Sequence, residues 1–134
     1  MFFLAVKAPA YADVPEYTVY RTAGKIVLDG VLDEKDWAAA PSVGPFVFPW
    51  WKSGEQEQTE VKLLWNDTYL YIAMDVQDTY IWADHYDTNS WTYQDDAVEF
   101  FWKPNTDDSN VYYFFEMNCI GNLLCVYDYA SGQF

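Results

Sequence analysis

The sequence predicts an all-β fold, an antiparallel β-sandwich of the jelly-roll or immunoglobulin-like kind with one short helical turn. Short segments rich in β-branched, leucine and aromatic residues recur along the chain, and residues typical of turns separate them. Only one segment has the features of a helix start, and it is short. Several strands at close spacing are typical of a sandwich rather than of a parallel α/β fold.

The first part of the chain is expected to hold two short strands and the helical turn. Residues 18–21 and 25–28 are strand candidates because they are apolar and turn residues flank them. Residues 32–37 follow a tight Asp-Gly turn and predict one turn of helix. Asp33 is its expected N-cap, and Trp37 is expected in the core.

A proline-containing segment comes next, at residues 46–51, and it is a candidate edge strand. Pro49 has no N–H to donate to a central ladder, which confines such a strand to the edge of a sheet. The adjacent pair Trp50 and Trp51 is expected to cover that edge.

The most regular predicted hairpin lies in the middle of the chain, at residues 60–65 and 69–76. Apolar side chains alternate along the second of these segments, which indicates a strand with one buried face. The three residues between the segments suit a hairpin turn. Trp65, at the end of the first strand, is expected in the core.

Three further strands are predicted after an aperiodic loop over residues 78–94. They occupy residues 97–102, 111–119 and 123–127, and a turn at Gly121 joins the last two into a hairpin. The chain therefore has enough strands for a two-sheet domain.

The net charge of the chain restricts its partners. The formal charge is −14 at pH 7, and no cluster of lysine or arginine is present to neutralise phosphates. Nucleic acid and anionic membrane surfaces are therefore not expected partners. Aromatic residues make up 21% of the chain, more than one core needs, so some rings are expected at the surface.

The ends of the sequence and its two cysteines give expectations about processing. Residues 1–12 are expected to be a truncated signal peptide, which predicts a secreted or periplasmic protein. Residues 13–134 are expected to form a single β-sandwich domain that is incomplete at its C-terminus, because no closing strand follows the last hairpin. Cys119 and Cys125 either pair or remain as buried thiols.

The segment from residue 82 to residue 99 mixes aromatic rings with polar side chains. Stacking of a sugar ring needs a Trp or Tyr beside carboxylates or amides, because the C–H face packs on the ring while the hydroxyls form hydrogen bonds. Trp91 and Tyr93 are the candidate rings, with Glu99 nearby. Alternatively, both rings only anchor the loop.

The strand predicted at residues 111–119 carries polar side chains on one face. Alternation puts Glu116 and Asn118 together with Tyr112 and Phe114. A charged group among rings is costly to bury, so this face is expected to be either solvated or functional.

The acidic residues and the single histidine are the candidates for catalysis and for cofactor binding. Asp95, Asp96 and Glu99 lie close in sequence, but nearby carboxylates are expected by chance in so acidic a chain, and no catalytic residue is predicted. His85 could ligate haem with Met74 or Met117. Calcium is a candidate structural cofactor, without a defined ligand loop. Its candidate ligands are Asp29, Asp33, Asp75 and Asp78.

The run Ile26-Val27-Leu28-Asp29-Gly30-Val31-Leu32-Asp33-Glu34-Lys35-Asp36-Trp37 resembles the opening of family 9 carbohydrate-binding modules. Three later stretches in the same order resemble that family too, and the resemblance extends from about residue 26 to the end. These stretches are 61–72, 95–101 and 112–118.

The resemblance implies a non-catalytic β-sandwich that binds cellulose- or xylan-type polysaccharide and accompanies a glycoside hydrolase. It also implies calcium stabilisation and a sugar slot with two aromatic walls, of which the second lies beyond residue 134. The carbohydrate-binding residues that it implies are Trp91 or Tyr93, Glu99, Glu116 and Asn118. Glu116 departs from the family, which can carry arginine there. A haem-binding electron-transfer domain and a structural spacer without ligand are the alternatives.

Overall fold

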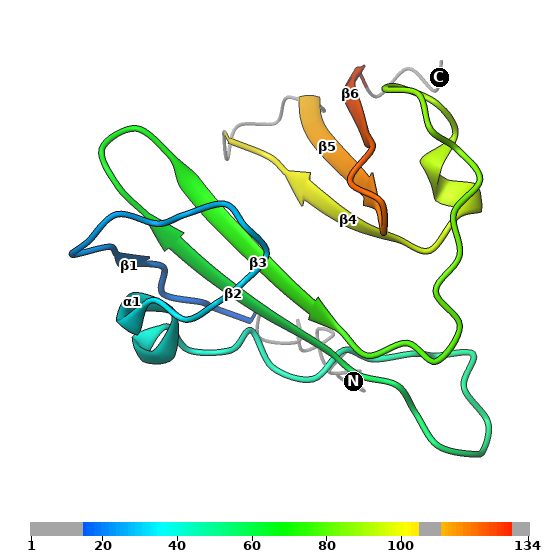
Figure 1. The fold of residues 1–134 in the computed structure, drawn as a ribbon, viewed down its shortest axis with the longest axis horizontal. Helices are drawn as coiled ribbons and strands as arrows, with labels where there is room; N and C mark the ends of the chain where they lie inside the picture. Colours follow the sequence, from blue (N-terminus) through cyan, green and yellow to red (C-terminus); the bar gives the residue numbers. More distant parts are fainter. Residues whose placement is uncertain (1–14, 105–110, 130–134) are drawn as a thin grey trace, which may run out of the picture. The chain divides into compact units, whose positions relative to one another are not determined.

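A computed structural model describes residues 15–104 and 111–129 of the chain (Figure 1). The described residues form two compact units, each drawn from separate stretches of sequence. Unit 1 contains residues up to 47 and residues 60–75, whereas unit 2 contains residues 48–59 and those from 76 onward. Each unit has a three-stranded sheet, and the helical elements are very short, so the predicted all-β class is confirmed.

Unit 1 is built on the sheet β1-β2-β3, whose strands are Tyr20–Arg21, Thr59–Trp65 and Leu70–Val76. The short β1 runs parallel to β2, with Tyr20 opposite Leu64. β2 and β3 form the predicted hairpin (Figure 1). The Asn66 side-chain oxygen accepts hydrogen bonds of 2.8 Å from the next turn residues, Thr68 and Tyr69, and so fixes the turn.

The core of unit 1 forms around the five-residue helix α1, Lys35–Ala39, which lies close to the predicted helical turn. Trp37 is buried as expected and clusters with Ile26, Ala40, Leu64 and Ala73. Large aromatic side chains contribute much apolar area, so this one ring supplies a large share of the burial.

The acidic residues around α1 hold the chain that precedes it. The Asp36 carboxylate accepts hydrogen bonds from the N–H groups of Ala23 and Gly24, at 3.1 and 3.0 Å. The Glu34 carboxylate accepts one from Val27 at 2.7 Å. Glu34 also occupies the N-cap position, although without a side-chain cap bond, so the prediction of Asp33 as N-cap was wrong. These carboxylates stabilise the loop rather than the helix end.

Unit 2 is built on the sheet β4-β5-β6, with strands Ala97–Trp102, Val111–Asn118 and Leu123–Tyr129 (Figure 1). Both pairings are antiparallel, and Glu99 lies directly opposite Glu116. Gly121 forms the predicted turn between β5 and β6 with a φ of 85°, a conformation that glycine adopts without a steric cost. All three strands were predicted, β4 with its full extent.

The loop before β4 ends in a short 3-10 helix, η1, at Thr92–Gln94. It packs against β4 and β5 and was not predicted, because three residues give no helical periodicity. Within the described ranges, no helix is long and apolar enough to cross a membrane.

Several predictions outside the regular strands were wrong. Residues 46–51 contain a turn at Pro49 and Trp50 and no strand. Residues 25–28 form no strand, and from that region only Tyr20–Arg21 joins β2. Trp65 is 40% exposed, and the Arg21 guanidinium lies 5.7 Å from the centre of its ring.

The cysteines also differ from both predicted states. Cys119 and Cys125 are free and exposed, so they are neither paired nor buried. The expected leader, residues 1–12, lies outside the described residues.

Candidate functional site

The structure brings all five predicted carbohydrate-binding residues into unit 2. Trp91 precedes η1 and Tyr93 lies within it, Glu99 lies on β4, and Glu116 and Asn118 lie on β5. Since η1 packs against both strands, one local cluster contains aromatic, carboxylate and amide groups.

The polar face of β5 is the buried face of that strand. Glu116 and Asn118 are each only 2% exposed, and Phe114, two residues before Glu116 on the same face, is also buried. The neighbouring residues Phe115 and Met117 are the exposed ones. Of the two expected alternatives, a solvated face and a functional one, burial excludes the first. The cost of burial must be offset by hydrogen bonds.

Glu116 obtains one such bond from η1. The Thr92 hydroxyl, itself fully buried, donates to Glu116 Oε1 at 2.6 Å. The carboxyl group of Glu99 forms a hydrogen bond with that of Glu116 from the opposite strand. Burial raises the pKa of Glu99, and the hydrogen bond to Glu116 and the repulsion from its charge raise it further. Glu99 therefore keeps its proton to a higher pH than an ordinary glutamate side chain.

Asp95 organises the other half of the cluster. Its buried carboxylate accepts hydrogen bonds from the N–H groups of Asp84 and His85, at 3.0 and 3.2 Å. The His85 ring and the Asn118 amide donate two more, at 2.9 and 2.8 Å. Burial by itself raises the pKa of Asp95, but these bonds outweigh it and hold that pKa well below the usual range of an aspartate. Asp95 is thus a buried anion with four donors.

Asn118 joins this anion to the turn after β5. Its amide also donates to the carbonyl of His85 at 2.8 Å, and its side-chain oxygen accepts from Asn122 at 2.8 Å. Both ends of the side chain are therefore occupied by the protein. The network fixes the long loop before η1 onto the β5-β6 hairpin.

The aromatic rings lie on the outside of this network. Trp91 is 63% exposed and Tyr93 is 56% exposed, whereas Thr92 between them is fully buried. The buried Thr92–Glu116 bond consequently holds a segment with two exposed rings in a fixed place. Exposed rings on a fixed support can stack on a flat ligand with little loss of conformational entropy.

Sequence reasoning missed the residues that build the support. No role was predicted for Thr92, and Asp95 was predicted only as one of the polar residues around the rings and not as the centre of a hydrogen-bond network. The one available signal was the density of Asp, Asn and Thr around the rings, a composition that favours side-chain to backbone bonds.

Two of the candidate calcium ligands form hydrogen bonds within the protein. In the portion of the chain that the structure describes, no group of three His, Cys, Asp or Glu residues could share a metal ion. Asp29 and Asp78 instead each accept a hydrogen bond from the N–H two residues later. Met117 is exposed, and the His85 ring nitrogen Nδ1 lies 2.9 Å from the Asp95 carboxylate.

Replacing Glu116 with glutamine is expected to bring the pKa of Glu99 back toward its ordinary value of 4.5. The substitution removes the neighbouring charge, supplies an N–H donor to Glu99, and keeps an acceptor for Thr92. A carbon-detected NMR titration of the Glu99 carboxyl group in both proteins measures the change. Identical titration curves would contradict the coupling.

The same pair has a consequence for stability. The folded state with a raised Glu99 pKa binds more protons than the unfolded chain above pH 4.5. The contribution of Glu99 to the free energy of unfolding therefore falls as the pH rises through this window. Denaturant unfolding measured at several pH values above 4.5 is expected to show a smaller fall in the free energy of unfolding for Glu116→Gln than for the wild-type chain.

Comparison with known proteins identifies a family for nearly the whole chain. The model of carbohydrate-binding family 9 matches residues 19–133, which include both sheets and the whole cluster. Comparisons with curated proteins and with solved structures give no significant match.

Proposed function

The chain belongs to carbohydrate-binding family 9, and from this premise we propose that it holds cellulose- or xylan-type polysaccharide by stacking sugar rings on Trp91 and Tyr93. Members of the family are non-catalytic binding modules. The observation that carries the proposal is the pair of exposed rings fixed by the buried Thr92–Glu116 bond. Stacking buries the C–H face of a pyranose and leaves its hydroxyls free for polar partners.

The polar residues of the cluster divide into two roles. Glu99 is exposed, whereas Glu116 is buried, so Glu99 accepts hydrogen bonds from sugar hydroxyls. Glu116 and Asn118 are almost fully buried and occupied by protein partners, so they position η1 and its loop. This division assigns affinity to the rings and orientation to the buried network.

The wider setting is part of the proposal. An acidic, non-catalytic module that binds uncharged polysaccharide is suited to deliver a partner glycoside hydrolase to its substrate outside the cytoplasm. Calcium would act on stability and not on the stacking step, because the described residues supply no ligand cluster beside the rings.

Trp91→Ala is expected to weaken binding of cello- or xylo-oligosaccharides at least about tenfold, or about 1.4 kcal/mol, because one stacking face is lost. Tyr93→Ala is expected to have a smaller effect of the same sign. Affinity electrophoresis and calorimetry, with and without calcium, measure both. Trp50→Ala is the matched control, because that ring is also exposed but lies outside the cluster.

Unchanged affinity in both ring variants would contradict the site. No binding by the folded wild-type chain to any of these sugars would contradict the proposed ligand class. If Trp50→Ala lost as much affinity as Trp91→Ala, the loss would be a general effect of removing an exposed aromatic ring.

A further inference from the structure

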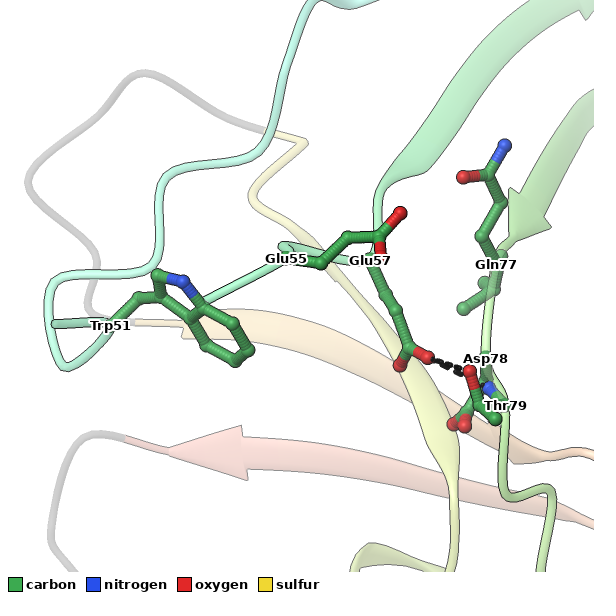
Figure 2. A pocket seen from close by; sticks show the side chains of 7 residues that line it. Trp51, Glu55, Glu57, Gln77, Asp78 and Thr79 are labelled. Atoms are coloured by element: carbon green, nitrogen blue, oxygen red, sulfur yellow. Dashed lines mark hydrogen bonds between the residues drawn. The ribbon is translucent and has the colours of Figure 1, made fainter. Parts of the chain in front are cut away.

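A second concave site lies in unit 2. It is an open pocket of about 620 Å³ between the loop after Pro49 and the segment that follows β3 (Figure 2). Figure 2 shows the indole of Trp51 on one side and the side chains of Glu57, Asp78 and Thr79 on the other, with Glu55 between. The pocket shares no residue with the cluster around Trp91.

Backbone and side-chain bonds fix the acidic side of this pocket. Gln77 donates its N–H to the carbonyl of Gln58 at 2.9 Å, which holds the two segments side by side. Glu57 Oε1 accepts from the Thr79 N–H at 2.9 Å and also from the Thr79 hydroxyl. Asp78 Oδ1 accepts from Tyr80 at 2.7 Å. These carboxylates are therefore placed before any ligand arrives.

The opposite side of the pocket is the ring of Trp51, which is 45% exposed. The backbone N–H of Trp51 donates to the carbonyl of Phe48 at 3.0 Å in a tight turn. Gly54 follows with a φ of 101°, which lets the chain turn from the ring toward Glu55. A large, half-exposed indole thus forms a flat apolar wall facing carboxylates.

The charge of this pocket is uncompensated. Among the described residues, Glu55, Glu57 and Asp78 form no ion pair, and each has at least one carboxylate oxygen without a protein partner. No Lys or Arg lines the pocket. The acids also do not converge closely enough for three of them to hold one metal ion. An organic cation is larger than a metal ion, so it fits the space between these separated carboxylates better than a metal ion does.

We propose that this pocket is a second ligand site that takes a cationic amino sugar, such as a glucosamine unit of a deacetylated aminopolysaccharide. The C–H face of the pyranose packs on Trp51, while its ammonium group lies against Glu57 and Asp78. The indole adds a cation–π attraction that a neutral sugar lacks. The choice of a sugar as ligand rests on the proposed carbohydrate-binding function; the positive charge rests on the pocket alone.

The test compares three hexasaccharides by calorimetry: a glucosamine oligomer, its N-acetylated counterpart and cellohexaose. The wild-type chain is expected to bind the glucosamine oligomer at least about tenfold more tightly than the N-acetylated one, and added salt is expected to weaken that binding. Trp51→Ala is expected to weaken it about tenfold. Glu57→Gln, which keeps an acceptor for Thr79, and Asp78→Asn are expected to act in the same direction.

Two matched controls separate the pocket from the general negative charge of the chain. Trp50→Ala removes a neighbouring exposed ring, and Asp87→Asn removes one exposed charge outside the pocket. Both are expected to leave glucosamine binding unchanged. Circular dichroism verifies that each variant is folded.

Equal affinity for the charged and N-acetylated oligomers would overturn the proposal. It would also be overturned if Asp87→Asn weakened binding as much as Glu57→Gln, because attraction would then come from net charge. Cellohexaose binding tests the Trp91 site separately. If the wild-type chain does not bind cellohexaose, the proposed function is contradicted, whereas the result for the glucosamine oligomer at the Trp51 pocket is unaffected.

Discussion

Asn118→Ala is expected to lower the free energy of unfolding by roughly 2–4 kcal/mol, a large loss for one polar side chain. The substitution leaves the buried Asp95 carboxylate with one donor fewer and the N–H of Asn122 without its side-chain acceptor. It also removes a donor from the carbonyl of His85. Unpaired buried groups lose their solvation without compensation, which is the reason for the expected size. Urea denaturation followed by circular dichroism measures the loss.

The neighbouring substitution Met117→Ala is the control for Asn118. Met117 lies one residue before Asn118 on the same strand, but its side chain is exposed. Its replacement is therefore expected to lower the free energy of unfolding by less than about 1 kcal/mol. Asn118→Ala is also expected to weaken sugar binding, because the loop before η1 loses its attachment. Equal stability of the two variants would show that the network is not a structural support.

Trp37→Ala is expected to destabilise unit 1 by about 3–5 kcal/mol, the range for removing a buried large aromatic ring. The ring is 4% exposed and lies in the only cluster of buried apolar residues found in the described part of unit 1. Small neighbours such as Ala40 and Ala73 cannot fill the space that it leaves. Amide hydrogen exchange is the suitable measurement, because it reports on β2 and β3 separately from unit 2.

Trp65→Ala is the matched control for Trp37. Both residues were predicted in the core, but Trp65 is 40% exposed and packs beside Arg21. A loss of about 1 kcal/mol or less is expected for it. Similar losses of protection in the two variants would contradict the assignment of the core to α1.

Strands were predictable from the sequence wherever one face is apolar and the other is polar or aromatic. β2, β3 and β4 were predicted nearly residue by residue. On β3 the alternation identified the strand but not its buried face, because Ala73 is buried while Leu70 and Val76 are exposed. The segment at residues 46–51 has the same apolar composition without alternation. Pro49 and Trp50 turn there, so composition alone gave the wrong element.

The candidate site was predictable in its exposed parts and not in its buried ones. Exposed rings beside acids are visible as a local mixture of residue types, which identified Trp91 and Tyr93. The bond between Thr92 and Glu116 joins residues 24 positions apart, and no local pattern specifies such a pair. The burial of Glu116 was unexpected for the same reason, because its hydrogen-bond partners come from distant segments.

The interleaving of the two units has a consequence for biosynthesis. The chain passes from one unit to the other after residues 47, 59 and 75, so neither unit is a continuous stretch. A ribosome that has delivered residue 75 has released all of unit 1, but the intervening tryptophan-rich loop still lacks the strands that complete its own unit. That loop, residues 48–59, therefore remains without the rest of its unit until the C-terminal hairpin has been synthesised. Transplanting unit 1 into another protein would consequently require excision of this loop and a short linker in its place.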